Sequence, residues 1–159
     1  MFNVFVKTID QTIEVAKCMA PALQLGDIIL LKGWLASGKT YFVKSLASAL
    51  GSTNSVTSPT YAIANFYDIK IGSLLHIDVY RLSGLPEFYD LGLEEFFPDS
   101  ITVVEWGEKV SEAFPTYLSI EFTHVDFEKD YRKLTFSYVG DKWHPYIESL
   151  SRQLSHFEQ

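Results

Sequence analysis

The sequence has little cysteine and no long apolar run. Cys18 is its single cysteine, so no internal disulfide can form, and a reducing compartment is expected. No apolar run approaches the roughly 18 residues that a membrane span needs. No charged segment followed by an apolar one resembles a signal peptide near the start. We therefore expect a cytoplasmic protein.

Basic residues are also scarce. The chain has thirteen Lys and Arg residues and twenty Asp and Glu residues, which gives a formal net charge of −7. A broad basic surface that holds nucleic acid by releasing counterions is therefore not expected. Contact with RNA would be local or shared with a partner protein.

Apolar residues make up 47% of the 159 residues, enough for a packed core without disulfides or a structural metal. The sequence shows no internal repeat and no linker long enough to separate domains. We expect residues 1–159 to form one domain.

Hydrophobic periodicity predicts alternating elements in the first third of the chain. Residues 4–7 are typical of a short strand, and residues 8–11 resemble a capping box that begins a helix. Residues 28–31 form an apolar run that is short enough for a strand buried on both faces. A helix is predicted over residues 41–50 and ends at Gly51.

Strands predominate in the rest of the chain. The predicted strands are residues 61–69, 74–79, 101–105, 118–124 and 133–139. The gap between residues 69 and 74 is too short for a crossover helix, so these two strands should form an antiparallel hairpin. Residues 142–157 have helical spacing and would serve as a packing helix or, alternatively, as a docking element.

The most specific motif is a P-loop in residues 33–40. Gly33, Gly38, Lys39 and Thr40 satisfy the pattern G-x-x-x-x-G-K-[ST] between a buried strand and a helix. Backbone N–H groups of such a loop, and the positive end of the following helix, bind phosphates. Lys39 would contact the β- and γ-phosphates, and the Thr40 hydroxyl would contact Mg²⁺. This motif predicts a nucleoside triphosphate-binding α/β fold with a mixed parallel and antiparallel sheet flanked by helices.

Two carboxylates are candidates for the remaining metal contact. Asp78 and Glu105 each follow an apolar strand, and carboxylates at neighbouring strand ends commonly complete a nucleotide-bound Mg²⁺ site. The sequence leaves open which of the two contacts the metal.

Four further motifs resemble one family, the bacterial TsaE ATPases of tRNA threonylcarbamoyladenosine biosynthesis. They are Val-Thr-Ser-Pro-Thr-Tyr at 56–61, His-Ile-Asp-Val-Tyr-Arg-Leu at 76–82, Leu-Gly-Leu-Glu-Glu-Phe-Phe at 91–97 and Val-Glu-Trp at 104–106. The resemblance extends from about residue 12 to residue 132. It implies a P-loop ATPase fold.

The resemblance also implies roles for individual residues. Thr40 and Glu105 would form the Mg²⁺ pair, Asp78 would orient the attacking water, and Thr60 would lie in a switch-type loop near the γ-phosphate. Lys39, Asp78 and Glu105 are the catalytic candidates. The residues expected to bind ATP are Thr12, Gly33, Ala36, Ser37, Gly38, Lys39, Thr40, Tyr41, Thr60 and Arg132. Arg132 has an alternative interpretation, as a charge on the edge of a strand.

The P-loop departs from the family's usual Gly-Asp-Leu-Gly-Ala-Gly-Lys-Thr-Thr. Trp34 stands where the family has Asp, and Ala36 stands where it has Gly, a position that can require a positive φ. Ser37 and Tyr41 differ as well. Trp106 would either shield the site or belong to the core.

The resemblance implies an ATP-binding, slowly hydrolysing subunit required to place threonylcarbamoyl on adenosine 37 of tRNAs that read codons beginning with A. TsaD-like and TsaB-like proteins would be its partners. Two alternatives share the P-loop, a small-molecule or nucleoside kinase and a GTP-dependent switch. The scarcity of arginine disfavours the kinase, and the lack of an Asn-Lys-x-Asp motif disfavours the switch.

Overall fold

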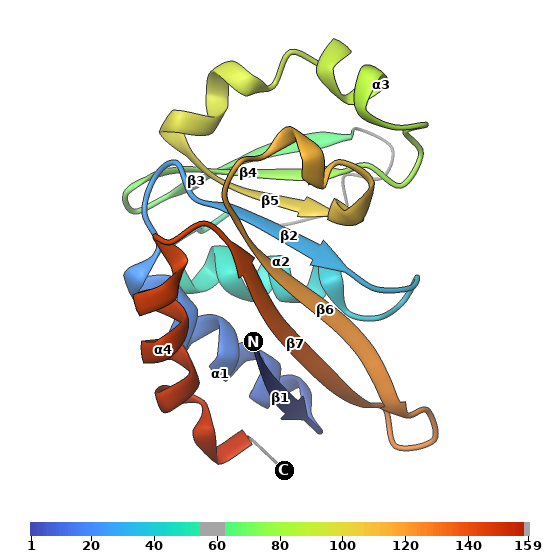
Figure 1. The fold of residues 1–159 in the computed structure, drawn as a ribbon. Helices are drawn as coiled ribbons and strands as arrows, with labels where there is room; N and C mark the ends of the chain where they lie inside the picture. Colours follow the sequence, from blue (N-terminus) through green and yellow to red (C-terminus); the bar gives the residue numbers. More distant parts are fainter. Residues whose placement is uncertain (55–62, 158–159) are drawn as a thin grey trace.

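A mixed seven-stranded sheet forms the centre of the computed structural model, which describes residues 1–54 and 63–157 (Figure 1). Its strands are β1 (Phe2–Val6), β2 (Ile28–Lys32), β3 (Ala64–Ile69), β4 (Gly72–Asp78), β5 (Ser100–Glu105), β6 (Tyr117–Asp126) and β7 (Tyr131–Val139). The strand order is β1-β7-β6-β2-β5-β4-β3. This arrangement confirms the expected fold class.

The centre of the sheet is parallel and both of its sides are antiparallel. Strand β2 pairs in parallel with β5 and β6, and β4 pairs in parallel with β5. Strands β3 and β4 form the predicted antiparallel hairpin, and β7 pairs antiparallel with β6 and β1. The apolar run of β2 is buried because it lies between two other strands and helices or loops cover both faces.

Two apolar cores lie on opposite faces of the sheet. The helices are α1 (Ile9–Met19), α2 (Lys39–Ala49), α3 (Leu85–Asp90) and α4 (Trp143–Gln153). Helices α1, α2 and α4 pack on one face, where Ile29 and Leu31 of β2 point. Helix α3 and neighbouring short 3₁₀ segments cover the other face, where Ile28 and Leu30 point. In Figure 1 these two layers lie on either side of the sheet. Within the described ranges, no helix combines the length and apolar character that crossing a membrane requires.

The start of α1 has the predicted capping interactions. The Thr8 side chain accepts a hydrogen bond from the backbone N–H of Gln11 at 3.2 Å. The Gln11 side chain in turn accepts one from the backbone N–H of Lys7, one residue earlier than in a standard capping box. These bonds satisfy backbone N–H groups at the start of the helix. Strand β1 ends just before them, at Val6.

Several predicted boundaries need correction. Helix α2 begins at Lys39 rather than at residue 41, since Gly38 is its N-cap. The strand predicted over residues 61–69 is seen as β3 from Ala64, and residues 55–62 lie outside the described part. Helix α3 and a 3₁₀ segment, η2 (Glu94–Asp99), were not predicted.

The C-terminal segment packs against the core. The expected helix over residues 142–157 divides into α4 and a 3₁₀ turn, η5 (Ser155–Phe157). Trp143, Ile147 and Leu150 bury one face of α4, and Lys142 forms an ion pair with the buried Asp27 just before β2. This face therefore supports the packing interpretation of the segment.

One close contact fixes the loop that follows β5. This loop forms a 3₁₀ turn, η3 (Gly107–Lys109), which lies directly on β2. A Cβ atom added to Gly107 would lie 2.5 Å from the Cβ of Leu30. Only glycine permits this approach, because real Cβ contacts are not that short.

Candidate functional site

The P-loop connects β2 to α2 through three residues with positive φ. Gly33, Ala36 and Gly38 have φ values of 138°, 61° and 103°. A Cβ on Gly33 would lie 2.8 Å from the carbonyl oxygen of Phe122, so the loop needs glycine there. Ala36 occupies the left-handed region, as the family's usual glycine at this position suggests, at a cost of about 1–2 kcal/mol for a non-glycine residue.

Lys39 is largely buried within this loop. Its ammonium donates hydrogen bonds to the carbonyl oxygens of Gly33 and Trp34, the latter at 2.9 Å. Burial lowers the pKa of Lys39 below its usual value, and the nearby Glu105, Glu108 and Asp78 carboxylates oppose this shift. The charge of Lys39 is thus held where polar groups of the loop and three carboxylates offset its loss of water.

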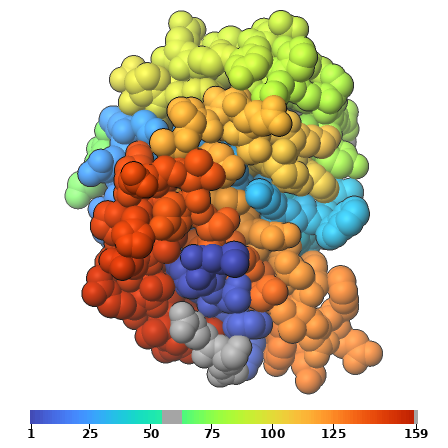
Figure 2. Space-filling model, in the orientation of Figure 1, coloured from blue at the N-terminus to red at the C-terminus, as the bar shows by residue number. Residues whose placement is uncertain are grey.

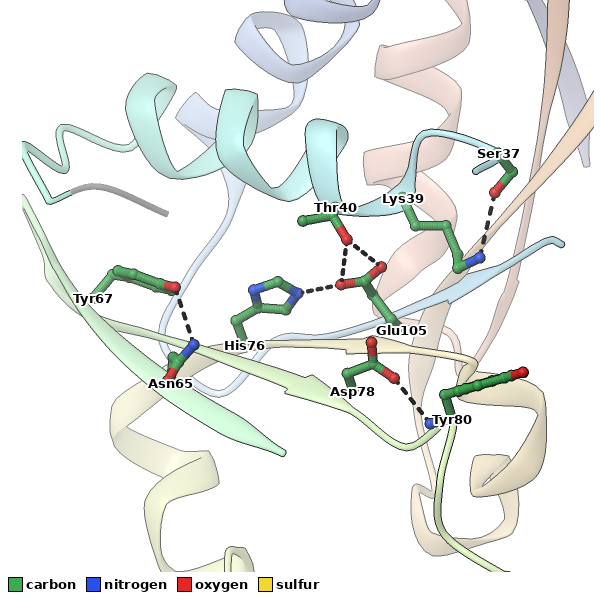
Figure 3. Close-up of polar contacts among 9 residues, drawn as sticks. All are labelled: Ser37, Lys39, Thr40, Asn65, Tyr67, His76, Asp78, Tyr80 and Glu105. Atoms are coloured by element: carbon green, nitrogen blue, oxygen red, sulfur yellow. Dashed lines mark hydrogen bonds and ion pairs between the residues drawn. The ribbon is translucent and has the colours of Figure 1, made fainter. Parts of the chain in front are cut away.

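Thr40, Glu105 and His76 form a chain of hydrogen bonds (Figure 3). The Thr40 hydroxyl lies 2.9 and 3.0 Å from the two carboxylate oxygens of Glu105. His76 Nε2 lies 2.6 Å from Glu105 Oε2. Glu105 is only 3% exposed and His76 is fully buried. The structure therefore joins the two predicted Mg²⁺ ligands and adds a histidine behind them.

Asp78 ends the strand beside Glu105. The two residues are register partners on parallel strands β4 and β5. One carboxylate oxygen of Asp78 accepts a hydrogen bond from the backbone N–H of Tyr80 at 2.9 Å. Both acids are buried and line the same cavity, so the parallel register explains why strand-end carboxylates converge here.

Trp106 lies over Lys39 at the edge of the site. Its ring centroid is 4.4 Å from the Lys39 ammonium and 4.9 Å from the ring centroid of Tyr80. Its backbone is in the left-handed region with φ of 61°. Trp106 is half-buried and also packs against the core on the α3 side of the sheet, so it covers Lys39 while part of it belongs to the core.

Two cavities flank the P-loop. The first, of about 260 Å³, is lined by P-loop residues together with Thr40, Asp78, Glu105 and Trp106. The second, of about 230 Å³, is lined by residues of β1, α1 and β7, including Thr12, Tyr41 and Arg132. Both cavities share residues 37, 38 and 41, so they form two compartments on either side of one loop.

Arg132 contacts the P-loop directly. Its Nε donates a hydrogen bond of 2.8 Å to the carbonyl oxygen of Ser37, and its Nη2 pairs with Asp130 at 2.9 Å. Arg132 is therefore not simply a surface charge at a strand edge. Its guanidinium supports the loop from the side of the second cavity.

Most predicted site residues thus lie in the two compartments. Lys39, Thr40, Asp78 and Glu105 meet in the first, whereas Thr12, Tyr41 and Arg132 line the second. Thr60 lies outside the described residues. His76 was not among the predicted site residues. Its position two residues before Asp78 on a predicted strand indicated that both side chains lie on the same face of the sheet.

Trp34 does not enter either compartment. Its side chain is 82% exposed and lines a wider cavity of about 660 Å³, which also contacts Trp106 and Phe127 at the tip of the β6–β7 hairpin. Figure 2 shows this hairpin protruding from the surface. Nothing in the structure explains why tryptophan stands at position 34.

The donor set of the first compartment fits Mg²⁺. Thr40 supplies a hydroxyl oxygen and Glu105 a carboxylate, and hard divalent cations prefer oxygen ligands. Mg²⁺ commonly takes one or two protein oxygens and completes its shell with substrate phosphates and water. The described residues could therefore hold the ion together with a triphosphate.

Comparisons with known proteins give a consistent result. The family model described as "Threonylcarbamoyl adenosine biosynthesis protein TsaE" matches residues 6–134. A Bacillus subtilis protein named "tRNA threonylcarbamoyladenosine biosynthesis protein TsaE" is 36% identical over 144 residues, which cover 90% of this chain and 89% of the relative. A Streptomyces coelicolor protein of the same name is 38% identical, covering 82% of this chain and 92% of the relative.

A solved structure shares the fold as well. The crystal structure of Bacillus subtilis YdiB superposes with a TM-score of 0.80 at 31% sequence identity, covering 96% of this chain and 95% of that chain. The agreement includes the mixed sheet and its covering helices.

Proposed function

This chain belongs to the TsaE family of threonylcarbamoyl adenosine biosynthesis proteins, and we propose that it binds and slowly hydrolyses ATP for that pathway. In this proposal the threonylcarbamoyl group reaches adenosine 37 of tRNA through partner proteins resembling TsaD and TsaB. The net charge of −7 supports a subunit that contacts tRNA weakly or only through those partners.

The proposal assigns the phosphates of ATP to the P-loop. Backbone N–H groups around Gly38 and the N-terminal end of α2 would bind the anionic oxygens. Lys39 would exchange its bonds to loop carbonyls for bonds to the β- and γ-phosphates, where its charge offsets the charge that develops during transfer. Trp106 above Lys39 would keep water away from this contact.

Thr40 and Glu105 would hold Mg²⁺ through their oxygens. When bound, Mg²⁺ neutralises charge on the β- and γ-phosphate oxygens. The hydrogen bonds between Thr40 and Glu105 already place both groups within reach of one ion.

Asp78 would orient the attacking water. Its carboxylate is fixed by the Tyr80 backbone N–H and borders the cavity of Lys39 and Thr40. A buried carboxylate in that place can accept a hydrogen bond from a water aligned with the γ-phosphate. The geometry thus favours Glu105 for the metal and Asp78 for the water.

A single observation carries the ATPase proposal, the meeting of Lys39, Thr40 and two strand-end carboxylates in one cavity. ATP turnover should be measured for the isolated protein, then with TsaD-like and TsaB-like proteins from the same source. We expect slow release of inorganic phosphate alone and faster release in the mixture. Absence of turnover in both would contradict hydrolysis, and equal turnover without complex formation would contradict the coupling.

The kinase alternative gains no support. Lys39 is the single cation among the described residues lining the first cavity, and nothing in the comparisons favours phosphoryl transfer to a small acceptor.

Arg132→Gln should weaken nucleotide binding. Removing the charged hydrogen bond to Ser37 O would loosen the loop, and such bonds contribute roughly 1.5–3 kcal/mol. The expected loss is about 10- to 100-fold in affinity for a fluorescent ATP analogue. Lys133→Gln, which removes the same charge one residue later, is the control. Equal affinity of the two variants would contradict a role for Arg132 in the site.

A further inference from the structure

We propose that His76 is a positioning residue that holds Glu105 in the orientation needed to bind Mg²⁺. This inference rests on the proposed function, because it concerns the same metal site. Its basis is the short contact from His76 Nε2 to Glu105 Oε2, at 2.6 Å, which lies between the sheet and α2 (Figure 3).

The surroundings of His76 define which ring nitrogen carries the proton. Its Nδ1 is buried without a hydrogen-bond partner among the described residues. A proton on Nδ1 would therefore be an unsatisfied buried donor, and it would leave the Nε2 lone pair facing a carboxylate oxygen. The hydrogen-bond network thus assigns the tautomer that carries the proton on Nε2, which donates to Glu105.

The backbone explains how His76 reaches this position. His76 precedes Asp78 by two residues on β4, so both side chains point to the same face of the sheet. The register places Asp78 opposite Glu105 on β5, and His76 two pairs further along the strands, opposite Val103. His76 therefore approaches Glu105 from the interior, while Asp78 and Thr40 lie at the edge where the phosphates would bind.

Glu105 is thus held on two sides. Thr40 contacts its carboxylate from α2 and His76 contacts it from β4. A carboxylate has about four lone-pair positions, so these bonds leave positions free for a metal ion. Such partners behind a metal ligand typically change metal affinity by about 10- to 100-fold when they are removed.

The side chains of glutamine and asparagine separate this role from general packing. The amide nitrogen of glutamine reaches about the place of Nε2 and can donate to Glu105, whereas that of asparagine reaches only the place of Nδ1. Both variants bury one neutral amide at the same position. A purely structural role would affect them similarly, but a role through Nε2 would not.

The test measures binding of Mn²⁺, as a paramagnetic substitute for Mg²⁺, to the protein saturated with a non-hydrolysable ATP analogue. Loss of the free Mn²⁺ electron paramagnetic resonance signal gives the Kd. We expect His76→Asn to raise this Kd about 10- to 100-fold and His76→Gln to keep it near the parent value. Affinity for the analogue in EDTA should stay unchanged for both variants, and circular dichroism should confirm that each is folded.

Three results would overturn the inference. One is parent-like Mn²⁺ affinity in His76→Asn, and another is an equal loss in folded His76→Gln. The third concerns the metal site itself. If both Glu105→Gln and His76→Asn bind Mn²⁺ like the parent, Glu105 does not bind the metal, and the inference fails together with the proposed metal site. If Glu105→Gln loses Mn²⁺ affinity but His76→Asn does not, only the role of His76 is wrong. If His76→Asn does not fold, His76→Leu replaces it, because leucine also lacks a donor at the place of Nε2; a parent-like Kd in folded His76→Leu would overturn the inference.

Discussion

Replacing Lys39 with alanine should reduce ATP turnover by about 100- to 1,000-fold. The ammonium is the only charged donor from the P-loop itself that points into the first cavity, among the described residues that line it. Without it, charge that develops on the γ-phosphate oxygens loses a preorganised partner in a partly buried site. Turnover at saturating ATP, measured as released phosphate, is the decisive quantity.

Lys44→Ala is the matched control for that substitution. Lys44 lies on the same helix α2 but is exposed, so its loss removes the same charge without touching the cavity. We expect its turnover to remain at the parent level. Full activity in Lys39→Ala would mean that the P-loop is not the site of hydrolysis.

Replacing Asp78 with asparagine should reduce turnover by roughly 100- to 10,000-fold while leaving nucleotide and Mn²⁺ affinity close to the parent values. Asparagine keeps the size of the side chain and an oxygen for the Tyr80 backbone N–H, so the fold should survive. It removes the negative charge that would orient water and accept its proton. Turnover and Mn²⁺ binding should be measured on the same preparation.

Asp68→Asn provides the control on the neighbouring strand β3, where the side chain is exposed. This variant should hydrolyse ATP at the parent rate. A loss of Mn²⁺ affinity in Asp78→Asn, comparable with the loss in Glu105→Gln, would instead assign Asp78 to the metal. Comparing Asp78→Asn with Glu105→Gln therefore decides which of the two acids contacts the metal, a question that the sequence left open.

Local patterns were sufficient to predict most of the sheet. The apolar run of β2, the short gap between β3 and β4 and the capping residues before α1 are features of neighbouring residues, so they can be recognised in the chain. The segment from α3 to η2 escaped prediction because its two helical pieces have six residues each, too short for an apolar stripe to repeat.

The site could be predicted in part, for a similar reason. Lys39 and Thr40 belong to a contiguous motif, and the acids end apolar strands. The contacts of Arg132 with Ser37 and of His76 with Glu105 were not visible in local patterns. Arg132 reaches Ser37 across 95 residues only because the β6–β7 hairpin returns over the P-loop, and His76 meets Glu105 only because β4 and β5 pair in parallel.

The close approach of Gly107 to Leu30 restricts position 107 to glycine. A single methyl group at position 107 would have to push η3 away from β2, and Trp106, the preceding residue, would move with it. The ring that covers Lys39 is therefore positioned by a residue that touches neither phosphate nor metal in the proposed complex. Gly107 contributes only its small size, and replacing this residue, which does not line the first cavity, would shift the tryptophan that covers Lys39.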